Sequence, residues 1–125
     1  MADIRAKGGE PLLMSPISRG TFDDSGNLYE AVSSNGISLA LFSETMRNLS
    51  VELGTEFVDM HALTYDLLES VGKAKSDSFF ATSSRIYQNR DTDFTHPIPA
   101  GAAAFAALFI KDVKRRGLKG SRLFK

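Results

Sequence analysis

Two short apolar runs lie along the chain, one near its start and one near its middle. Pro11 to Ser15 forms the first and is ended by Pro16, and Phe57 to Asp59 forms the second. Short runs without polar alternation are typical of strands buried on both faces, as in parallel sheets. We therefore predict a strand at each run.

Three other segments place apolar residues at three- and four-residue steps, the spacing of an amphipathic helix. The stripe of the first consists of Leu39, Phe42, Met46, Leu49 and Leu53. Ser38 can cap the start of this helix and Gly54 can end it. A second helix is predicted from His61 to Val71, closed by Gly72, and a third from Pro99 to about Arg116. Strand, loop, helix, strand and helix in this order indicate an α/β fold.

The remaining segments are predicted to be mostly loops. From Ser18 to Gly36, clusters of Gly, Asp, Asn and Ser supply repeated turn chemistry. The polar stretch from Lys73 to Arg90 is predicted to be a loop with at most one turn of helix, anchored by Phe79 and Phe80. Residues 1–10 are predicted to be irregular.

Composition narrows the class of protein further. A chain of 125 residues suffices for one domain, and its 42% of apolar residues can bury a substantial core. The absence of cysteine excludes disulfides, thiolate zinc sites and cysteine nucleophiles. No feature predicts a cofactor.

Charge and hydropathy name no partner either. Fifteen basic and fifteen acidic side chains cancel, so no overall field attracts nucleic acid or an anionic membrane. Seven of the basic residues fall between Lys111 and Lys125, where we expect a helix C-terminus and, over 117–125, a solvated basic tail. Met1 to Glu10 lacks the apolar core of a signal peptide, and no apolar run approaches the roughly 20 residues that cross a bilayer, so we predict a soluble protein of unspecified compartment.

The tetrapeptide Asp93-Phe94-Thr95-His96 carries the candidate chemistry. In a turn, this spacing lets the carboxylate reach the imidazole and fix its tautomer, so that the second ring nitrogen can take a proton from a hydroxyl. Pro97 keeps His96 out of helical dihedral angles. Taken alone, such a pair is more often a surface ion pair or a helix-entry loop.

The context of this pair resembles the last sequence block of SGNH, or GDSL, hydrolases. In that block Asp-x-x-His is followed within a few residues by Gly-Ala and a C-terminal helix, which Asp93, His96, Gly101 and Ala102 match in order and spacing. Pro11 to Arg19 and the segment ending in Asp59 are also similar to strands of the rhamnogalacturonan acetylesterase branch.

The resemblance implies a three-layer α/β/α sandwich with a parallel sheet, of which residues 1–125 form a single partial domain without the N-terminal strands. It further implies that His96 is the general base and that Asp93 orients it, with an acetylated polysaccharide or another small ester as substrate. Members of this family are often secreted.

Three blocks of that family are absent from the chain, including the Gly-Asp-Ser block that carries the nucleophile. Ser25 follows an aspartate, but it lies in a turn-rich loop and is interpreted as a turn residue. One hypothesis is therefore an acetylesterase completed by an upstream or partner segment. The alternative is an inactive hydrolase fragment that binds carbohydrate or protein, and self-association is an option for either.

Two further residues need comment. Asp59 and His61 could suggest a metal site, but no third ligand follows at a usable spacing, so a helix-start histidine is the better interpretation and no metal is predicted. Ile98 occupies the helix-cap position, where the family more often has a polar residue. Losing a side-chain cap costs about 1 kcal/mol, which weakens the last helix without abolishing it.

Overall fold

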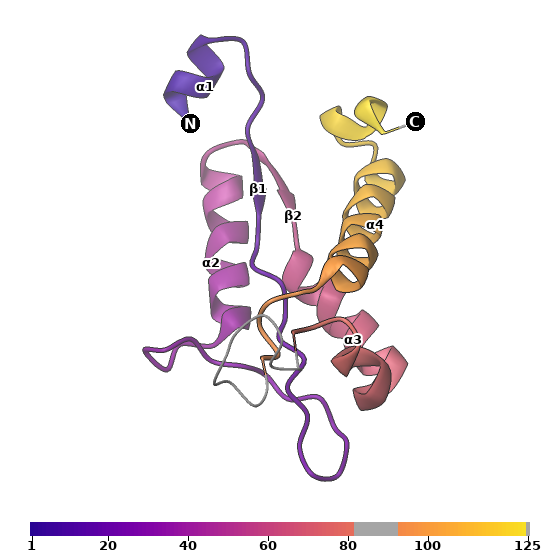
Figure 1. The fold of residues 1–125 in the computed structure, drawn as a ribbon. Coiled ribbons are helices and arrows are strands. Elements are labelled where there is room, and N and C mark those ends of the chain that lie inside the picture. Colours follow the sequence, from indigo (N-terminus) through magenta and orange to yellow (C-terminus); the bar gives the residue numbers. More distant parts are fainter. Residues whose placement is uncertain (82–92, 125) are drawn as a thin grey trace.

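The computed structural model describes residues 1–81 and 93–124, and the chain alternates helices and strands (Figure 1). In chain order the elements are α1 (Ala2–Ala6), β1 (Leu12–Met14), α2 (Leu39–Glu52), β2 (Glu56–Val58), α3 (Met60–Asp77), α4 (Pro99–Arg116) and the 3₁₀ helix η1 (Lys119–Leu123). Both predicted strands and all three predicted helices are present.

The two strands pair in parallel, with Leu13 opposite Phe57 in the register. The ladder continues past β1, because the Ser15 amide donates to the Val58 carbonyl at 3.1 Å. Helix α2 connects the strands and packs against both, while α4 packs against β2 from the opposite side of the strand pair in Figure 1. The predicted α/β class with parallel strands is confirmed.

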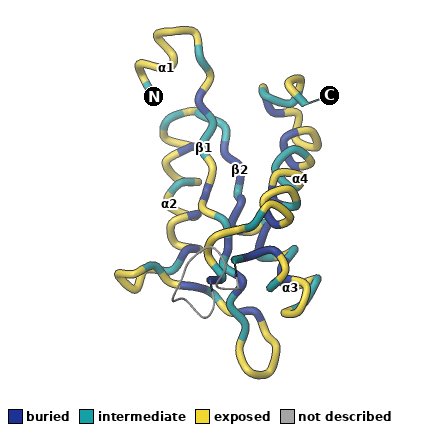
Figure 2. Tube along the Cα trace, in the orientation of Figure 1, coloured by how far each residue is buried: buried dark blue, intermediate teal, exposed yellow. Residues whose placement is uncertain are grey.

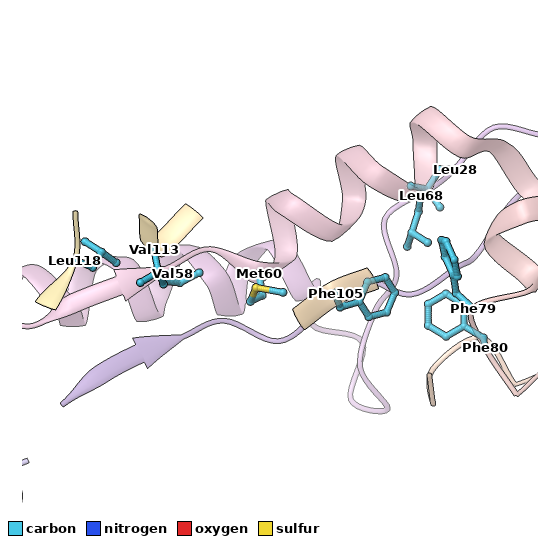
Figure 3. Close-up of a cluster of buried hydrophobic side chains, with 9 residues drawn as sticks. All are labelled: Leu28, Val58, Met60, Leu68, Phe79, Phe80, Phe105, Val113 and Leu118. Carbon is cyan, nitrogen blue, oxygen red and sulfur yellow. The ribbon is translucent and has the colours of Figure 1, made fainter. Parts of the chain in front are cut away.

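A cluster of buried apolar side chains fills the space between β2, α3 and α4 (Figure 3). Phe105 of α4 lies at its centre, with ring centroids 6.0 Å from Phe79 and 5.9 Å from Phe80. Val58 and Leu68 are completely buried. Figure 2 shows the same contrast along the chain, with burial along β2 and exposed residues over α1 and much of α2. The prediction that Phe79 and Phe80 anchor their segment is confirmed.

Helix α2 begins and ends where its sequence signals indicated. The Ser38 side chain accepts a hydrogen bond from the Ala40 amide at 3.1 Å, and Gly54 follows the helix with a φ of 55°. Positive φ is unfavourable for residues with a side chain, which explains the glycine at this stop.

The end of α3 differs from the prediction. Gly72 does interrupt the helix, with a φ of 72° and a ψ of 170°, but helical structure resumes and continues to Asp77. An ion pair one turn apart supports this second stretch, because Lys73 Nζ lies 2.8 Å from Asp77 Oδ2. The expected loop from Lys73 is therefore helical over its first five residues, and its part from residue 82 to 90 lies outside the described residues.

Both ends of the chain are more ordered than predicted. The expected irregular N-terminus contains α1, whose Arg5 side chain donates to the Leu53 carbonyl at 2.8 Å. The expected solvated tail folds back on the domain over its described residues. Leu118 is buried, and the Phe124 ring meets Phe109 edge to face at 5.9 Å. The prediction of a solvated tail was wrong because it considered the basic residues and overlooked the apolar residues between them, which pack on the domain.

The long loop before α2 consists of turns, as predicted. Asp23 Oδ1 accepts hydrogen bonds from the amides of Ser25 and Asn27, both at 2.9 Å, and Gly26 completes this turn with a φ of 82°. Ser25 is exposed at the tip, which confirms its interpretation as a turn residue. Among the described residues, no helix has the length and apolar character to cross a bilayer.

Truncating a core leucine should cost far more than truncating an exposed one. Leu68→Ala removes a side chain that is 0% exposed and should lower the free energy of unfolding by about 2–5 kcal/mol, through lost burial and the cavity left behind. Leu41→Ala, at a helical position 52% exposed, is the matched control and should cost well under half as much. Urea denaturation measures both, and equal losses would contradict the assigned core.

Candidate active site

The segment from Asp93 to His96 lies at the end of the strand pair where α3 begins, directly before α4 (Figure 1). This end is the carboxyl end of both strands. In α/β proteins, ligands bind outside the carboxyl ends of parallel strands, because loops there converge around a crevice. The candidate residues therefore occupy the edge of the sheet at which a site is expected.

Asp93 holds the His96 ring directly. Asp93 Oδ2 lies 2.7 Å from His96 Nδ1, and Oδ1 accepts hydrogen bonds from the amides of Thr95 at 2.9 Å and His96 at 3.0 Å. The Asp93 side chain is 6% exposed and that of His96 57%. The predicted contact is confirmed, with the carboxylate buried behind an imidazole that faces outward.

The hydrogen bonds keep Asp93 ionised. Burial by itself raises the pKa of Asp93, but hydrogen bonds from the Thr95 amide, the His96 ring and the His96 amide together hold that pKa below its ordinary value. A buried carboxylate next to Nδ1 fixes the tautomer and the orientation of the ring and leaves Nε2 on the exposed side. This arrangement suits a histidine that must take up and release a proton.

Backbone hydrogen bonds fix this loop from two other segments of the chain. The Gly20 amide donates to the Phe94 carbonyl at 3.1 Å, and the Ala81 amide donates to the His96 carbonyl at 3.0 Å. The Phe79 carbonyl accepts from the Ile98 amide at 2.9 Å. The position of the imidazole therefore depends on the loop after β1 and on the end of α3, and not on its own segment alone.

Two glycines allow these close approaches. A Cβ atom at Gly101 would lie 2.2 Å from the Phe79 carbonyl oxygen, and one at Gly20 would lie 2.7 Å from the Phe80 ring. Neither space can hold a methyl group without movement of the backbone or of a buried ring. The glycine of the Gly101-Ala102 pair thus has a physical reason, namely the packing of α4 against Phe79.

The missing side-chain cap at Ile98 is confirmed, since no side chain caps α4. Two other features stabilise the start of α4. Pro99 occupies a first-turn position, and the Ile98 carbonyl accepts a hydrogen bond from the Ala102 amide at 2.9 Å. The Ile98 amide itself is satisfied by the Phe79 carbonyl.

Asp59 organises the same edge of the sheet. Its Oδ1 accepts from Ser43 at 2.7 Å, from Ser15 at 3.2 Å and from the Ala62 amide at 3.0 Å, while Arg47 pairs with Oδ2. Burial raises the pKa of Asp59, but these hydrogen bonds and the Arg47 charge outweigh it, so the pKa lies below its ordinary value. Asp59 therefore ties β1, α2 and the start of α3 together.

His61 has a carboxylate neighbour that sequence reasoning missed. Its Nε2 lies 3.1 Å from Glu30 Oε2, an ion-pair distance without the alignment of a hydrogen bond. Glu30 Oε1 also accepts from the Ala40 amide at 2.9 Å, and so helps to cap α2. No spacing rule connects residues so far apart in sequence. In the described ranges, no group of three or more potential metal ligands occurs.

An apolar groove of about 410 Å³ begins beside the candidate site. Its walls come from β1 and the loop after it, through Met14 and Ile17, and from α4, through Ala102, Ala106 and Phe109. Pro97, the neighbour of His96 in the chain, lies at one end. The groove therefore connects the exposed side of β1 with the segment that carries the imidazole.

The parallel strands, the terminal helix and the aspartate–histidine pair resemble the C-terminal portion of SGNH-type ester hydrolases, and comparison with known proteins finds esterases among the similar proteins. No family profile matches the chain. The chain is 26% identical over 121 residues to the probable rhamnogalacturonan acetylesterase YesY of Bacillus subtilis. This alignment covers 94% of the chain and 48% of YesY.

The uncharacterized esterase YxiM of Bacillus subtilis is also similar, with 26% identity over 117 residues, or 94% of the chain and 27% of YxiM. The crystal structure of YxiM superimposes with a TM-score of 0.70 and 27% identity, over 95% of the chain and 29% of that structure. The chain thus spans about half the length of one relative and about a quarter of the other.

Adding a methyl group at Gly101 should disturb the contact with Phe79. In most helices Gly→Ala stabilises by up to about 1 kcal/mol, but here Gly101→Ala should destabilise by about 1–3 kcal/mol because the new Cβ overlaps a carbonyl oxygen. Gly120→Ala, with nothing within 4 Å of the added atom, is the control and should change stability little. Thermal unfolding of both variants decides, and a stabilised Gly101→Ala variant would refute the close approach.

The stability of the fold should depend on pH through Asp93. Since its pKa is lower in the folded than in the unfolded chain, Asp93 contributes stability above the ordinary carboxyl pKa, and this contribution is lost as the pH falls through the lowered folded pKa. The wild-type free energy of unfolding should therefore decrease across that acidic range, and Asp93→Asn should flatten the decrease.

Urea midpoints measured over an acidic pH series test this dependence. Asp24→Asn, at an exposed loop position, should retain the full slope. Parallel curves for wild type and Asp93→Asn would show that Asp93 gains nothing from its hydrogen bonds.

Proposed function

We propose that this chain supplies the acid–base half of an ester hydrolase that removes O-acetyl groups from pectic rhamnogalacturonan. The observation that carries the proposal is the 2.7 Å contact between His96 Nδ1 and the buried Asp93 carboxylate at the carboxyl end of the strands. The similarity to a probable rhamnogalacturonan acetylesterase supports the substrate class.

The proposed mechanism uses a serine from the Gly-Asp-Ser block that this family resemblance implies and that the printed sequence does not contain. As the serine oxygen attacks the acetyl carbonyl, His96 Nε2 takes its proton. The imidazolium then gives this proton to the sugar oxygen, which leaves as an alcohol. Water, deprotonated by His96, next attacks the acetyl-serine, and acetate leaves as the serine regains its proton.

Asp93 performs two tasks in this scheme. Its Oδ2 holds the ring so that Nε2 faces the reacting groups, and its negative charge stabilises the imidazolium formed at each attack. The amides of Thr95 and His96 hold Oδ1, so the carboxylate keeps one orientation throughout. In hydrolases with such a triad, replacing this carboxylate by an amide lowers kcat by about 10⁴-fold.

The two edges of the strand pair support a larger sheet in which the other strands lie next to β1. On the outer side of β2, Arg116 Nη1 donates to the Phe57 carbonyl at 2.7 Å and is itself held by Asp112 at 3.0 Å. The Phe57 carbonyl, on the outer edge of β2, is therefore already bound by a side chain of α4. Among the described residues no strand covers the other edge, that of β1. The proposed three-layer sandwich would be completed there.

The basic C-terminal residues support the expectation that nucleic acid is not the partner. Arg115 and Arg116 both pair with the buried Asp112 carboxylate, at 2.5 and 3.0 Å. Lys119 pairs with Glu10 at 2.9 Å. These two carboxylates offset part of the positive charge of the C-terminal segment, which lowers its attraction for phosphates.

A chimera tests the catalytic proposal. The chain replaces the matching half of YesY, and hydrolysis of an acetyl ester is measured after intact YesY has been shown to be active. The chimera should be active, and Asp93→Asn should lower its kcat by about 10⁴-fold. His96→Ala should lower kcat by up to about 10⁶-fold, because the base is lost outright. Ser25→Ala, at the exposed turn, is the control and should keep full activity.

A fluorophosphonate probe locates the nucleophile. The chimera should be labelled and the 125-residue chain should not. Labelling of the chain alone, with ester hydrolysis that His96→Ala abolishes, would contradict the assignment of the serine to another segment. An inactive chimera whose segment from this chain still binds pectin fragments in titration calorimetry would favour the alternative, a hydrolase-derived binding module.

A further inference from the structure

We infer that Thr64 of α3 is a positioning residue for His96. Its hydroxyl fixes the loop after β1 in the place from which that loop orients the peptide next to Asp93 and, through Asp93, the imidazole ring. This role rests on the proposed function, in which His96 is the general base. Thr64 is completely buried, so it acts through other residues and not on a substrate.

The Thr64 hydroxyl joins α3 to the loop after β1. Thr64 is 0% exposed and Ser18 1%. The hydroxyl oxygen accepts a hydrogen bond from the Ser18 amide at 2.8 Å and donates to the Met60 carbonyl, one turn earlier in the helix, at 2.6 Å. A buried amide that loses its acceptor is destabilising, because no water takes the place of the lost partner. The backbone at Ser18 is therefore tied to α3 through the Thr64 side chain.

The loop reaches the Asp93–His96 tetrapeptide two residues after Ser18. The Gly20 amide donates to the Phe94 carbonyl at 3.1 Å. At most about 7 Å of extended chain separates Ser18 from Gly20, so a displacement of one is passed to the other. Gly20 is also closely packed, because a Cβ atom there would lie 2.7 Å from the Phe80 ring. The Thr64 tie thus sets where the Gly20 amide meets the tetrapeptide.

A single peptide unit passes this position on to Asp93. The Phe94 carbonyl and the Thr95 amide belong to the same planar peptide, so neither can rotate without the other. Gly20 holds the carbonyl side of this peptide at 3.1 Å, and Asp93 Oδ1 accepts from its amide side at 2.9 Å. Asp93 Oδ2 in turn lies 2.7 Å from His96 Nδ1. The peptide plane links the loop after β1 to the carboxylate that orients the ring.

Two further contacts of the loop do not replace this tie. The Arg19 side chain donates to the Val32 carbonyl at 2.9 Å, which joins two parts of the same loop. Tyr65 of α3 donates to the Leu28 carbonyl at 3.2 Å, in a later part of the loop. The Thr64 bond instead acts at the corner that meets the tetrapeptide. Removal of its hydroxyl should therefore be felt at the catalytic pair.

The test compares Thr64→Val and Thr64→Ser in the 125-residue chain. Valine keeps the shape of the side chain but leaves the Ser18 amide without its acceptor, whereas serine keeps the hydroxyl. In Thr64→Val the Gly20 and Thr95 amides should exchange hydrogen about tenfold faster than in wild type. The ring ¹⁵N shifts of neutral His96 should show the proton on Nδ1 in wild type and a mixture of tautomers in Thr64→Val. Thr64→Ser should restore both properties.

Two control variants separate positioning from general stability. Thr45 makes the same kind of bond one turn back, to the Leu41 carbonyl at 2.8 Å, but lies exposed on α2. Thr45→Val should leave the His96 tautomer unchanged. Leu118 is buried at the opposite end of the apolar cluster from the ring of Phe80 (Figure 3). Leu118→Ala should destabilise the fold and also leave the tautomer unchanged.

The tautomer decides whether Thr64 has this role. An unchanged tautomer in Thr64→Val, or an equal shift in Leu118→Ala, would overturn the inference. If Thr64→Val does not fold, Thr64→Ala takes its place, because alanine and serine at this position differ only by the hydroxyl. Equal ring spectra for Thr64→Ala and Thr64→Ser would then overturn it.

Kinetics in the YesY chimera give a second measurement. Thr64→Val should lower kcat about tenfold and change KM less than about twofold, because a misdirected ring impairs proton transfer without removing a substrate contact. Thr64→Ser should keep a kcat near that of the unsubstituted chimera. Equal kcat values for the valine and serine variants would overturn the inference. An inactive chimera, together with a shifted tautomer in Thr64→Val, would support the role of Thr64 and count against the proposed function.

Discussion

The candidate site depends on the contact between α4 and the end of α3. The Phe79 carbonyl accepts a hydrogen bond from Ile98, and the absence of a side chain at Gly101 lets the helix approach that carbonyl. From this contact Phe105 reaches the rings of Phe79 and Phe80, and the preceding loop receives its fixed backbone. The geometry of the aspartate–histidine pair is thus a consequence of helix packing, because the loop has no regular structure of its own.

The two aspartates at the carboxyl end of the strands are stabilised in the same way, by several hydrogen-bond donors each. Asp93 and Asp59 are both partly or fully withdrawn from water, and both are compensated by several donors instead of one. Asp59 is surrounded by two hydroxyl groups, an amide and Arg47, which suits a structural tie. In Asp93, by contrast, one carboxylate oxygen contacts the exposed imidazole of His96. The two carboxylates lie at the same edge of the sheet, but of the two only Asp93 contacts an exposed imidazole.

Local patterns explain what the sequence could predict. The strands, α2 and α4 follow from apolar spacing, the Ser38 cap and the position of Pro99, and the Asp93–His96 contact spans only three residues. The wrong predictions have two causes. Some contacts join residues that are distant in sequence, and in α3 a single glycine interrupts the helix without ending it. Helix α3 resumes after Gly72, and the tail is fixed by Glu56, whose carboxylate accepts from the Lys119 amide at 3.0 Å. The pairing of Glu30 with His61 likewise depends on how the long loop returns to the fold.

The hydrogen bond from Arg116 to the Phe57 carbonyl affects how strands of other molecules could add to this sheet. A strand pair that could accept neighbours on both sides would add copies without limit, in the manner of a filament. The Arg116 side chain occupies the Phe57 carbonyl on the outer side of β2, so a further strand on that side would have to displace it. This contact therefore disfavours open-ended growth through the outer side of β2.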